Sequence, residues 1–335
     1  MLNIHTPSTP GHLRVTQTMV EDFLIDPVLG VKVFFGLELD DFQKSRLRTY
    51  WWVPNVIDSS GVSTGKTLAF FLFFNLRALL IPGQKMMVMY QQFQAGKDQF
   101  WKYYRDQKTR APLFTKQLGK VDLLGESEGK ANSQGASCYI QYFKNDSEIQ
   151  MPAPNWLQMA SGQKGIDINV LGIDEWTEAE AKGQKDGGVG AINKQLLSRV
   201  RRSSFNQFHP LWGNHRVFMA SAESPAHPAW RRYRAFQKRI EAGDPNYALI
   251  SYSYRDFSRK ISHTGKSFRD EFRNETMLQN LRSELTAAEY DRQALGIWRR
   301  ETSGWYSEEA LQRCVNYGIA IGLTPEGAAV AAAPP

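Results

Sequence analysis

A short loop of small residues that ends in Gly-Lys-Thr constrains the fold of this chain more than any other feature. This Gly-Lys-Thr loop runs from Asp58 to Thr67 and opens into an apolar stretch, Leu68 to Leu80, typical of a buried helix. Such a loop can surround phosphate groups with backbone N–H groups, and a helix N-terminus adds partial positive charge. In loops of this kind the lysine, here Lys66, reaches the β- and γ-phosphates, and the hydroxyl of Thr67 ligates Mg²⁺. The loop therefore predicts a site for ATP and Mg²⁺.

The loop departs from the usual pattern at its first glycine. That pattern has Gly five residues before Gly65, where this chain has Ser60, with a glycine shifted to Gly61. We expect the nucleotide contacts to come from one continuous run: Ser60, Gly61, Val62, Ser63, Thr64, Gly65, Lys66 and Thr67. Because Gly-Lys-Thr is a short motif that also occurs by chance, the prediction depends on the elements around it.

Short apolar runs on both sides of the loop have the composition of buried strands. Residues 50–57 precede the loop, and residues 85–90 follow the apolar stretch, which Pro82 and Gly83 end. A strand, a loop and a helix in this order are the context that a phosphate-binding loop requires. The sequence therefore predicts an α/β P-loop fold with a mostly parallel central sheet flanked by helices.

Another strand-like segment, residues 169–175, lies about a hundred residues after the loop. It is mostly apolar and ends in two adjacent carboxylates. We expect Asp174 to hold Mg²⁺ through water and Glu175 to take a proton from the attacking water as general base. Two acids also occur by chance at strand ends. Here each motif lies where the other requires it, which favours the functional interpretation.

Two further positions are candidates for contact with the nucleotide. Gln43 lies in a helical pattern upstream of the loop, and its single amide can both donate to and accept from the edge of an adenine. The alternative is an ordinary glutamine on a helix surface. A strand-like run, residues 216–224, ends in small and hydroxyl residues, and a polar strand tip there can sense the γ-phosphate and transmit its loss.

Residues 263–267 also end in Gly-Lys-Ser, but they do not predict a second nucleotide site. Position 260 is Lys where the pattern needs Gly, and the run that follows, residues 268–271, is strongly charged. No apolar strand with paired acids follows it either.

The basic residues favour a polyanionic partner. The net charge is +7 and the pI is near 9.3. The second half of the chain contains a crowd of basic residues: Arg199, Arg201, Arg202, Arg216, Arg231, Arg232, Arg234, Lys238, Arg239, Arg255, Arg259, Lys260, Arg299 and Arg300. This distribution suits nucleic acid bound through its backbone. The alternative for any one of these residues is a solvated surface position, with or without an ion pair.

Length and composition exclude several classes of protein. At 335 residues and 38.2 kDa the chain can bury a large core, and it suits one α/β domain or a domain with an appended subdomain. Two cysteines, Cys138 and Cys314, exclude a disulfide framework and a cysteine-based zinc site. No apolar run is long enough to span a bilayer, and residues 1–5 do not begin a signal peptide. We expect an intracellular protein without a membrane partner.

These motifs together resemble the ATPase half of the large subunit of tailed-phage terminases, the motors that package DNA into capsids. The resemblance runs from roughly residue 21 to residue 305, with Gln43 as the adenine motif, 60–67 as Walker A, 170–175 as Walker B, and Ser221, Ala222 and Glu223 as the coupling motif. It implies an additional-strand, RecA-like P-loop fold and ATP-driven translocation of double-stranded DNA. It also implies that the active protein is a homo-oligomeric ring on a portal protein, although the isolated chain is a monomer. The implied partner is a small terminase subunit, and the implied location is the host-cell cytoplasm during virus assembly.

The resemblance also implies a division of the chain. We expect a flexible arm over residues 1–20, the ATPase core over 21–255, a helical lid or linker over 256–305, and a linker or tail over 306–335. The large subunits continue into a nuclease domain built on clustered acids that bind two metals. No strand-borne acidic cluster follows residue 305, so we expect no nuclease activity from this chain.

Two departures limit what the resemblance implies. The family often places a basic residue inside the phosphate loop, and residues 59–64 contain none. We therefore expect an arginine from a neighbouring subunit to complete the site, and the candidates are Arg199, Arg201 and Arg202. Their alternative is a DNA-facing or plain surface role. Glu223 stands where a small or hydroxyl residue is more usual, which weakens the coupling role at that position.

Two other functions fit the same motifs. The first is a different nucleic-acid translocase or a helicase, although a helicase normally needs a second RecA-like domain and the residues after 254 are too few and too helical for one. The second is a nucleotide-gated module that docks on DNA or on a portal with little turnover.

Overall fold

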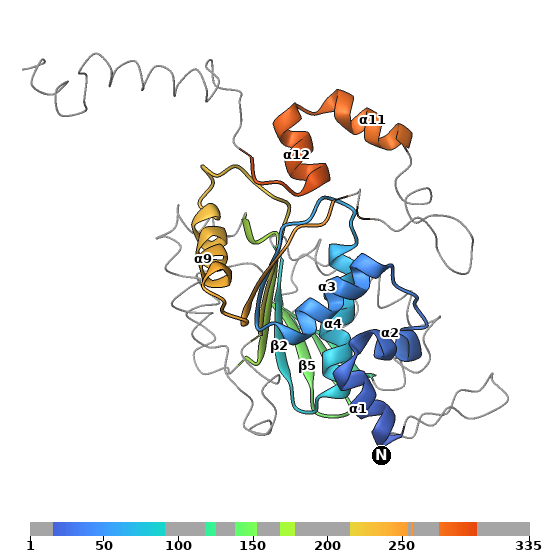
Figure 1. Cartoon of the computed structure of the whole chain (residues 1–335). Helices are drawn as coiled ribbons and strands as arrows, with labels where there is room; N and C mark the ends of the chain where they lie inside the picture. The colour runs from blue at the N-terminus through green and yellow to red at the C-terminus, as the bar shows by residue number, and fades with distance from the viewer. Residues whose placement is uncertain are drawn as a thin grey trace, which may run out of the picture.

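The computed structural model of the chain describes residues 16–90, 118–124, 138–152, 168–177, 215–253, 256 and 275–299. The helices are α1 (Gln17–Ile25), α2 (Pro27–Phe35), α3 (Asp41–Trp52), α4 (Lys66–Leu80), α9 (Trp230–Glu241), α11 (Glu275–Glu284) and α12 (Ala287–Leu295). The strands are β1 (Asn55–Asp58), β2 (Lys85–Met89), β3 (Leu118–Leu124), β4 (Cys138–Phe143), β5 (Glu148–Pro152), β6 (Val170–Asp174), β7 (His215–Met219) and β8 (Tyr247–Ile250). Figure 1 shows their arrangement.

The strands form one sheet in the order β3-β4-β5-β2-β6-β7-β1-β8. The six strands from β5 to β8 in this order pair in parallel, and β3, β4 and β5 pair antiparallel. β7 therefore lies between β1, which leads into the Gly-Lys-Thr loop, and β6, which ends in the carboxylates. This inserted strand is the hallmark of the additional-strand P-loop fold, and the predicted fold class is confirmed.

Alternation along the central strands divides the core into two layers. Val56, Val88 and Val217 pack with residues of α1 to α4, whereas Ile57 and Phe218 pack with residues of α9. Successive side chains of a strand point to opposite faces, so two layers of helices are needed to bury both. Figure 1 shows α1 to α4 on one side of the sheet and α9 on the other.

Helix α4 lies at the centre of the first layer, and its residues Ala69 to Leu80 are all buried. A glycine of β6 lets it approach the sheet closely. A Cβ atom built at Gly172 would lie 2.3 Å from Cζ of Phe70 and 2.6 Å from Cζ of Phe74. The helix that begins at the Gly-Lys-Thr loop therefore packs directly on the strand that ends in the carboxylates.

The predicted strand over residues 50–57 is wrong in its first half. Helix α3 continues to Trp52, and β1 begins only at Asn55. Tyr50 and Trp51 favour a strand by composition, but both are buried against α4, where their rings contact Phe73 edge to face. Helical geometry ends before Pro54, which disfavours it in the preceding residue. None of the described helices combines the length and the apolar character needed to cross a membrane.

Candidate nucleotide-binding site

The Gly-Lys-Thr loop connects the carboxyl end of β1 to the first turn of α4. Its backbone is left-handed at Ser63, with φ of 59°, and at Gly65, with φ of 76°. A Cβ atom at Gly65 would also lie 2.9 Å from Nε2 of Gln43, but the left-handed conformation is the main reason for glycine there. The loop therefore turns sharply before α4 begins at Lys66.

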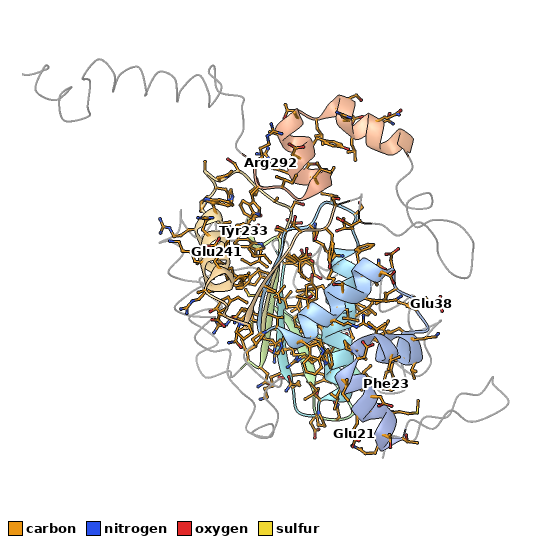
Figure 2. The ribbon with its side chains drawn as sticks, in the orientation of Figure 1. Glu21, Phe23, Glu38, Tyr233, Glu241 and Arg292 are labelled. Carbon is orange, nitrogen blue, oxygen red and sulfur yellow. The ribbon has the colours of Figure 1, made fainter. Side chains whose placement is uncertain are left out.

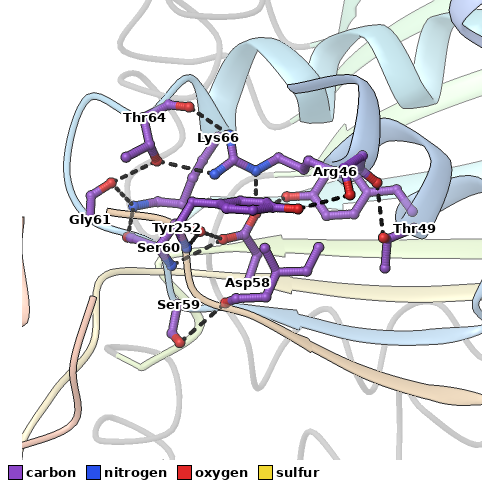
Figure 3. A network of polar contacts seen from close by, with 12 residues as sticks. Arg46, Thr49, Asp58, Ser59, Ser60, Gly61, Thr64, Lys66 and Tyr252 are labelled. Atoms are coloured by element: carbon purple, nitrogen blue, oxygen red, sulfur yellow. Dashed lines mark hydrogen bonds and ion pairs between the residues drawn. The ribbon is translucent and has the colours of Figure 1, made fainter. Parts of the chain in front are cut away.

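Beneath the loop, the last residue of β1 forms the centre of a buried polar network (Figure 3). Oδ2 of Asp58 lies 2.7 Å from Nε of Arg46, and both side chains are fully buried. The hydroxyl of Tyr50 donates to the same oxygen at 2.6 Å. On the other oxygen, Asp58 accepts from the backbone N–H and the hydroxyl of Ser60, at 3.0 and 2.5 Å. The serine that replaces the usual glycine is therefore part of this network.

Arg46 also holds the far side of the loop. Its Nη1 donates to the carbonyl oxygen of Thr64 at 2.6 Å, and its Nη2 donates to the Thr64 hydroxyl at 3.2 Å. That hydroxyl in turn donates to the carbonyl oxygen of Gly61 at 2.8 Å. One guanidinium on α3 thus ties the end of β1 to the last turn of the loop and fixes the loop's width.

The charges in this network favour an ionised Asp58. Burial pushes the pKa of Asp58 up, but Arg46, Lys66 and the hydrogen bonds from Ser60 and Tyr50 outweigh it and hold the pKa below its usual value. The pKa of Tyr50 is raised well above its ordinary value by burial and by Asp58, so its phenol stays protonated and donates. The network therefore keeps an ion pair in the interior.

Lys66 lies over the mouth of the loop. Its Nζ donates to the carbonyl oxygens of Ser60 at 2.5 Å and Gly61 at 3.1 Å. The pKa of Lys66 is lowered, mainly by burial and also by the charge of Arg46. The charges of Asp58, Glu175 and Asp174 act in the opposite direction and raise it. Asp58 and Asp174 both pair with Met219 of β7, so the ends of β1 and β6 lie at one edge of the sheet on either side of a single strand.

Asp174 and Glu175 differ in exposure. Asp174 is buried, and burial together with the charge of Glu175 raises its pKa from 3.8 to about 7. Its Oδ1 accepts from the backbone N–H of Glu175 at 3.0 Å. Glu175 is exposed and left-handed, with φ of 50°, a conformation that glutamate rarely adopts. Strain of this kind persists only where the surrounding structure imposes it, and it clusters at functional sites.

The donor set fits Mg²⁺. No three acidic, histidine or cysteine side chains within the described residues form a metal cluster. Mg²⁺, however, is commonly bound through one or two carboxylates together with phosphates and water. Asp174 is a buried carboxylate that forms no ion pair with a described residue, and Thr67 offers a hydroxyl in the first turn of α4. These two residues are the ones that would hold the ion.

The loop is covered from two other elements. The carbonyl oxygens of Ile250 and Tyr252, at the end of β8, accept from the N–H groups of Ser59 at 2.9 Å and Gly61 at 2.8 Å. At the end of α12, the carbonyl oxygen of Gln293 accepts from the N–H of Val62 at 2.6 Å. A Cβ atom at Gly61 would lie 2.4 Å from the carbonyl oxygen of Ala294. The shifted glycine of the motif is thus explained by the close approach of α12.

The residues predicted to contact the adenine and to form the coupling motif lie next to the Gly-Lys-Thr loop. Gln43 is buried beside Gly65, and its Oε1 accepts from the N–H of Asp40 at 3.0 Å to cap α3. Its Nε2 is therefore the group left to meet an adenine. Ser221, Ala222 and Glu223 follow β7 at the same edge of the sheet, just after Ala220, whose N–H donates to the carbonyl oxygen of Asp58 at 3.1 Å. The adenine and coupling roles stay predictions.

Arg199, Arg201 and Arg202 lie outside the described residues, as does the second Gly-Lys-Ser sequence at 265–267. The sequence did not indicate the roles of four residues of the site: Arg46, Tyr50, Asp58 and Tyr252. The N–H of Tyr252 donates to the Ser60 hydroxyl at 2.9 Å. One signal was available for two of them. Arg46 and Tyr50 fall on the same helical face as the apolar Phe42 and Leu47, which places an arginine on a buried face just upstream of the loop.

Comparison with known proteins supports the fold. No family model matches the chain, and no curated protein matches it in sequence. The large terminase of bacteriophage HK97 matches with a TM-score of 0.50 and 12% identity, over 78% of this chain and 51% of that protein. The large terminase of a thermophilic bacteriophage, in complex with ADP, gives 0.49 and 12%, over 78% and 54%. Yeast (S. cerevisiae) Dbp5, bound to Nup159, Gle1, IP6 and ADP, gives 0.40 and 14%, over 69% and 52%.

The chain therefore spans about half the length of these two large terminases, at 51% and 54%. At 12% identity such a likeness concerns the fold. The resemblance to large terminases predicted from the sequence motifs is confirmed at that level: the chain has the fold of the ATPase part of these proteins.

Proposed function

We propose that this chain binds ATP with Mg²⁺ and hydrolyses it to ADP and phosphate, as the motor of a large terminase that moves double-stranded DNA into a capsid. One observation carries the proposal. Asp58 of β1 and Asp174 of β6 both pair with Met219 of β7, the single strand between them, so the loop with Lys66 and the two acids at the end of β6 lie at the same edge of the sheet. Both acids also raise the pKa of Lys66, against the lowering by burial. A lysine, a buried acid and an exposed acid in this arrangement are what hydrolysis of a nucleoside triphosphate requires.

Each residue has a separate task in this scheme. Lys66 exchanges its two backbone carbonyl partners for phosphate oxygens, which are stronger acceptors because they are charged. Glu175, exposed at the strand end, accepts a proton from the water that attacks the γ-phosphate. Thr67 and Asp174 would hold Mg²⁺, which neutralises charge on the phosphate oxygens. Arg46 keeps the loop in shape through Thr64.

The remaining partners are proposed from the resemblance. Arg199, Arg201 or Arg202 of a neighbouring subunit would complete the charge compensation in a homo-oligomeric ring. The ring would act on a portal protein, with a small terminase subunit to deliver DNA, in the host-cell cytoplasm. The domain limits given above and the coupling role of Ser221, Ala222 and Glu223 belong to the same proposal.

Steady-state hydrolysis by the DNA-bound, assembled protein tests the proposal. Glu175→Gln should lower the rate by about 100-fold or more, the usual contribution of a general base, and should retain ATP binding. Lys66→Ala should lose binding of a fluorescent ATP analogue. Glu284→Gln, an exposed glutamate of α11, is the matched control and should leave both unchanged. An unchanged rate in Glu175→Gln would refute the assignment of the base. Unwinding of a forked duplex would identify a helicase instead, and binding with no turnover would identify a docking module.

A further inference from the structure

The outward side of α9 carries a basic face, which we define as Arg231, Arg234, Lys238 and Arg239. Arg231, Lys238 and Arg239 are exposed, and Arg234 is half-buried. Figure 2 shows α9 at the edge of the molecule, with side chains that project away from the sheet. At 3.6 residues per turn, Arg231 and Lys238 lie nearly in line, with Arg234 between them and Arg239 beside them. The face therefore presents its charges on one side of the helix.

The opposite side of α9 fixes the direction of this face. Phe236 is buried and packs edge to face on Phe218 of β7, with ring centroids 6.1 Å apart, and on Tyr247 of β8, at 5.0 Å. Two of the basic residues are also held over rings of their own surroundings. The guanidinium of Arg234 lies 5.9 Å from the ring centroid of Trp230, and that of Arg239 lies 5.8 Å from Tyr247. The charges of Arg234 and Arg239 are therefore oriented before any partner binds, which reduces the entropy lost on binding.

The charge of the basic face is not compensated within the described residues. Elsewhere in the described chain, basic side chains pair with carboxylates: Lys32 with Glu38, Lys44 with Asp41, Arg48 with Asp26 and Arg299 with Asp291. No such pair involves a member of the basic face, and α9 carries one acid, Glu241, against five basic residues. Like charges one turn apart destabilise a helix. A partner with many negative charges would offset this cost.

The chemistry of the face selects among polyanions. A membrane-binding helix needs a broad open apolar side, but Tyr233 and Phe236 of α9 pack against the core at the sheet, and Ile240 is the one large apolar residue of α9 that is exposed. Single-stranded nucleic acid needs open aromatic platforms. Here the nearby rings pack against one another. Trp230 stacks on Tyr233 with ring centroids 5.2 Å apart and an interplanar angle of 12°, and the ring centroid of Trp298 lies 4.9 Å from that of Tyr233. What remains for a partner is a row of cations.

We propose that the basic face of α9 binds the phosphate backbone of duplex DNA without reading its sequence. Arg231 and Lys238 are about 10 Å apart along the helix axis, at 1.5 Å per residue. A duplex carries one charge per about 1.7 Å of its axis, so about six phosphate charges pass within that span. The inference rests on the proposed motor for its setting, but the binding itself needs no nucleotide.

Nucleotide-free DNA binding tests the inference. Fluorescence anisotropy would follow a labelled duplex of about 30 base pairs against the full chain, from about 50 to 200 mM salt. The test variant is Arg231→Ala with Lys238→Ala and Arg239→Ala. The control variant is Lys32→Ala with Lys85→Ala and Lys144→Ala, which removes the same charge from other exposed positions. Circular dichroism would establish that both variants are folded. A double variant, Arg231→Ala with Lys238→Ala, replaces the triple variant if the latter fails to fold.

Wild type and control should bind alike. The triple variant should bind at least about tenfold more weakly, and its plot of log affinity against log salt should be less steep by about 3, one unit for each lost phosphate contact. If wild type binds duplex and the triple variant binds equally, with the same slope of log affinity against log salt, the proposed DNA binding by the basic face is refuted while the motor proposal stands. If wild type does not bind duplex without nucleotide, the proposed role of the basic face is refuted, and the motor proposal is decided separately by the hydrolysis assay. Tighter binding to single-stranded DNA, or to anionic lipid vesicles, would also overturn the inference.

Discussion

Removal of one partner from the buried pair between Arg46 and Asp58 should cost a large share of the stability of the whole chain. In Arg46→Met the carboxylate of Asp58 would stay in the interior with the hydrogen bonds from Tyr50 and Ser60 but without its counter-ion. Because both side chains are fully buried, no water can replace the guanidinium. Removal of one partner of such a pair costs about 3–5 kcal/mol. Since domains are stable by about 5–15 kcal/mol, the variant should remain folded but marginal.

Helix α3 offers a matched control two residues further on. Arg48 pairs with Asp26 at 2.7 Å, but the two side chains are 47% and 29% exposed. Arg48→Met should therefore cost at most about 1 kcal/mol, because water screens the pair. Chemical denaturation of the two variants measures the difference directly, and ATP affinity should fall in Arg46→Met alone because Thr64 loses its anchor.

A double-mutant cycle with Asp58→Asn separates the pair from its surroundings. Since Arg46→Met combined with Asp58→Asn removes both charges of the pair, it should cost less than the sum of the two single variants by about 2 kcal/mol or more. If Arg46→Met costs no more than Arg48→Met, or if the cycle shows strict additivity, the reasoning from burial and charge is refuted.

Two further predictions concern the ends of β6 and α12. Burial and Glu175 raise the pKa of Asp174 from 3.8 to about 7, so the folded state binds this proton more tightly and loses stability as the pH rises from about 4 through 7. Asp174→Asn should therefore be more stable than wild type at pH about 8 and equal to it near pH 4, which denaturation at several pH values would measure. A variant less stable than wild type at pH about 8 would show instead that a cation in the protein stabilises the carboxylate. Gly61→Ala should lower the melting temperature and weaken ATP binding, because its Cβ would lie 2.4 Å from the carbonyl oxygen of Ala294; a variant as stable as wild type would show that α12 does not pack on the loop.

Local patterns were sufficient for the outline of the fold. Short apolar runs and a loop that leads into an apolar helix predict β1, α4 and β6, because each motif is continuous in sequence. The end of α3 was not predictable in this way. Tyr50 and Trp51 favour a strand by composition, and the helix persists there because both pack on Phe73 of α4. Tertiary contacts between distant segments decide such boundaries, and a local pattern does not contain them.

The candidate site was predicted where it depends on single motifs and missed where it depends on pairs. Lys66, Asp174 and Glu175 follow from residue type and position. The roles of Asp58 and Arg46 follow only from their meeting at 2.7 Å, twelve positions apart across a helix and a strand. The same holds for Gly61, whose glycine is required by a carbonyl group of α12. A one-dimensional pattern indicates which groups can do chemistry, whereas the groups that position them are defined by packing.

The absence of a basic residue from positions 59–64 of the loop is only partly compensated by Arg46. Its guanidinium lies beneath the loop, yet it is fully buried, and its nitrogens contact Thr64 and Asp58. A donor committed to the loop backbone stabilises the shape of the loop but does not follow charge that develops on a transferred phosphoryl group. Lys66, by contrast, donates to two neutral carbonyl oxygens of the loop, and it can exchange them for phosphate without giving up an ion pair with a described residue. Compensation of a second charge in the transition state therefore requires a cation from another part of the chain or from a neighbouring subunit, which is the role proposed for Arg199, Arg201 or Arg202.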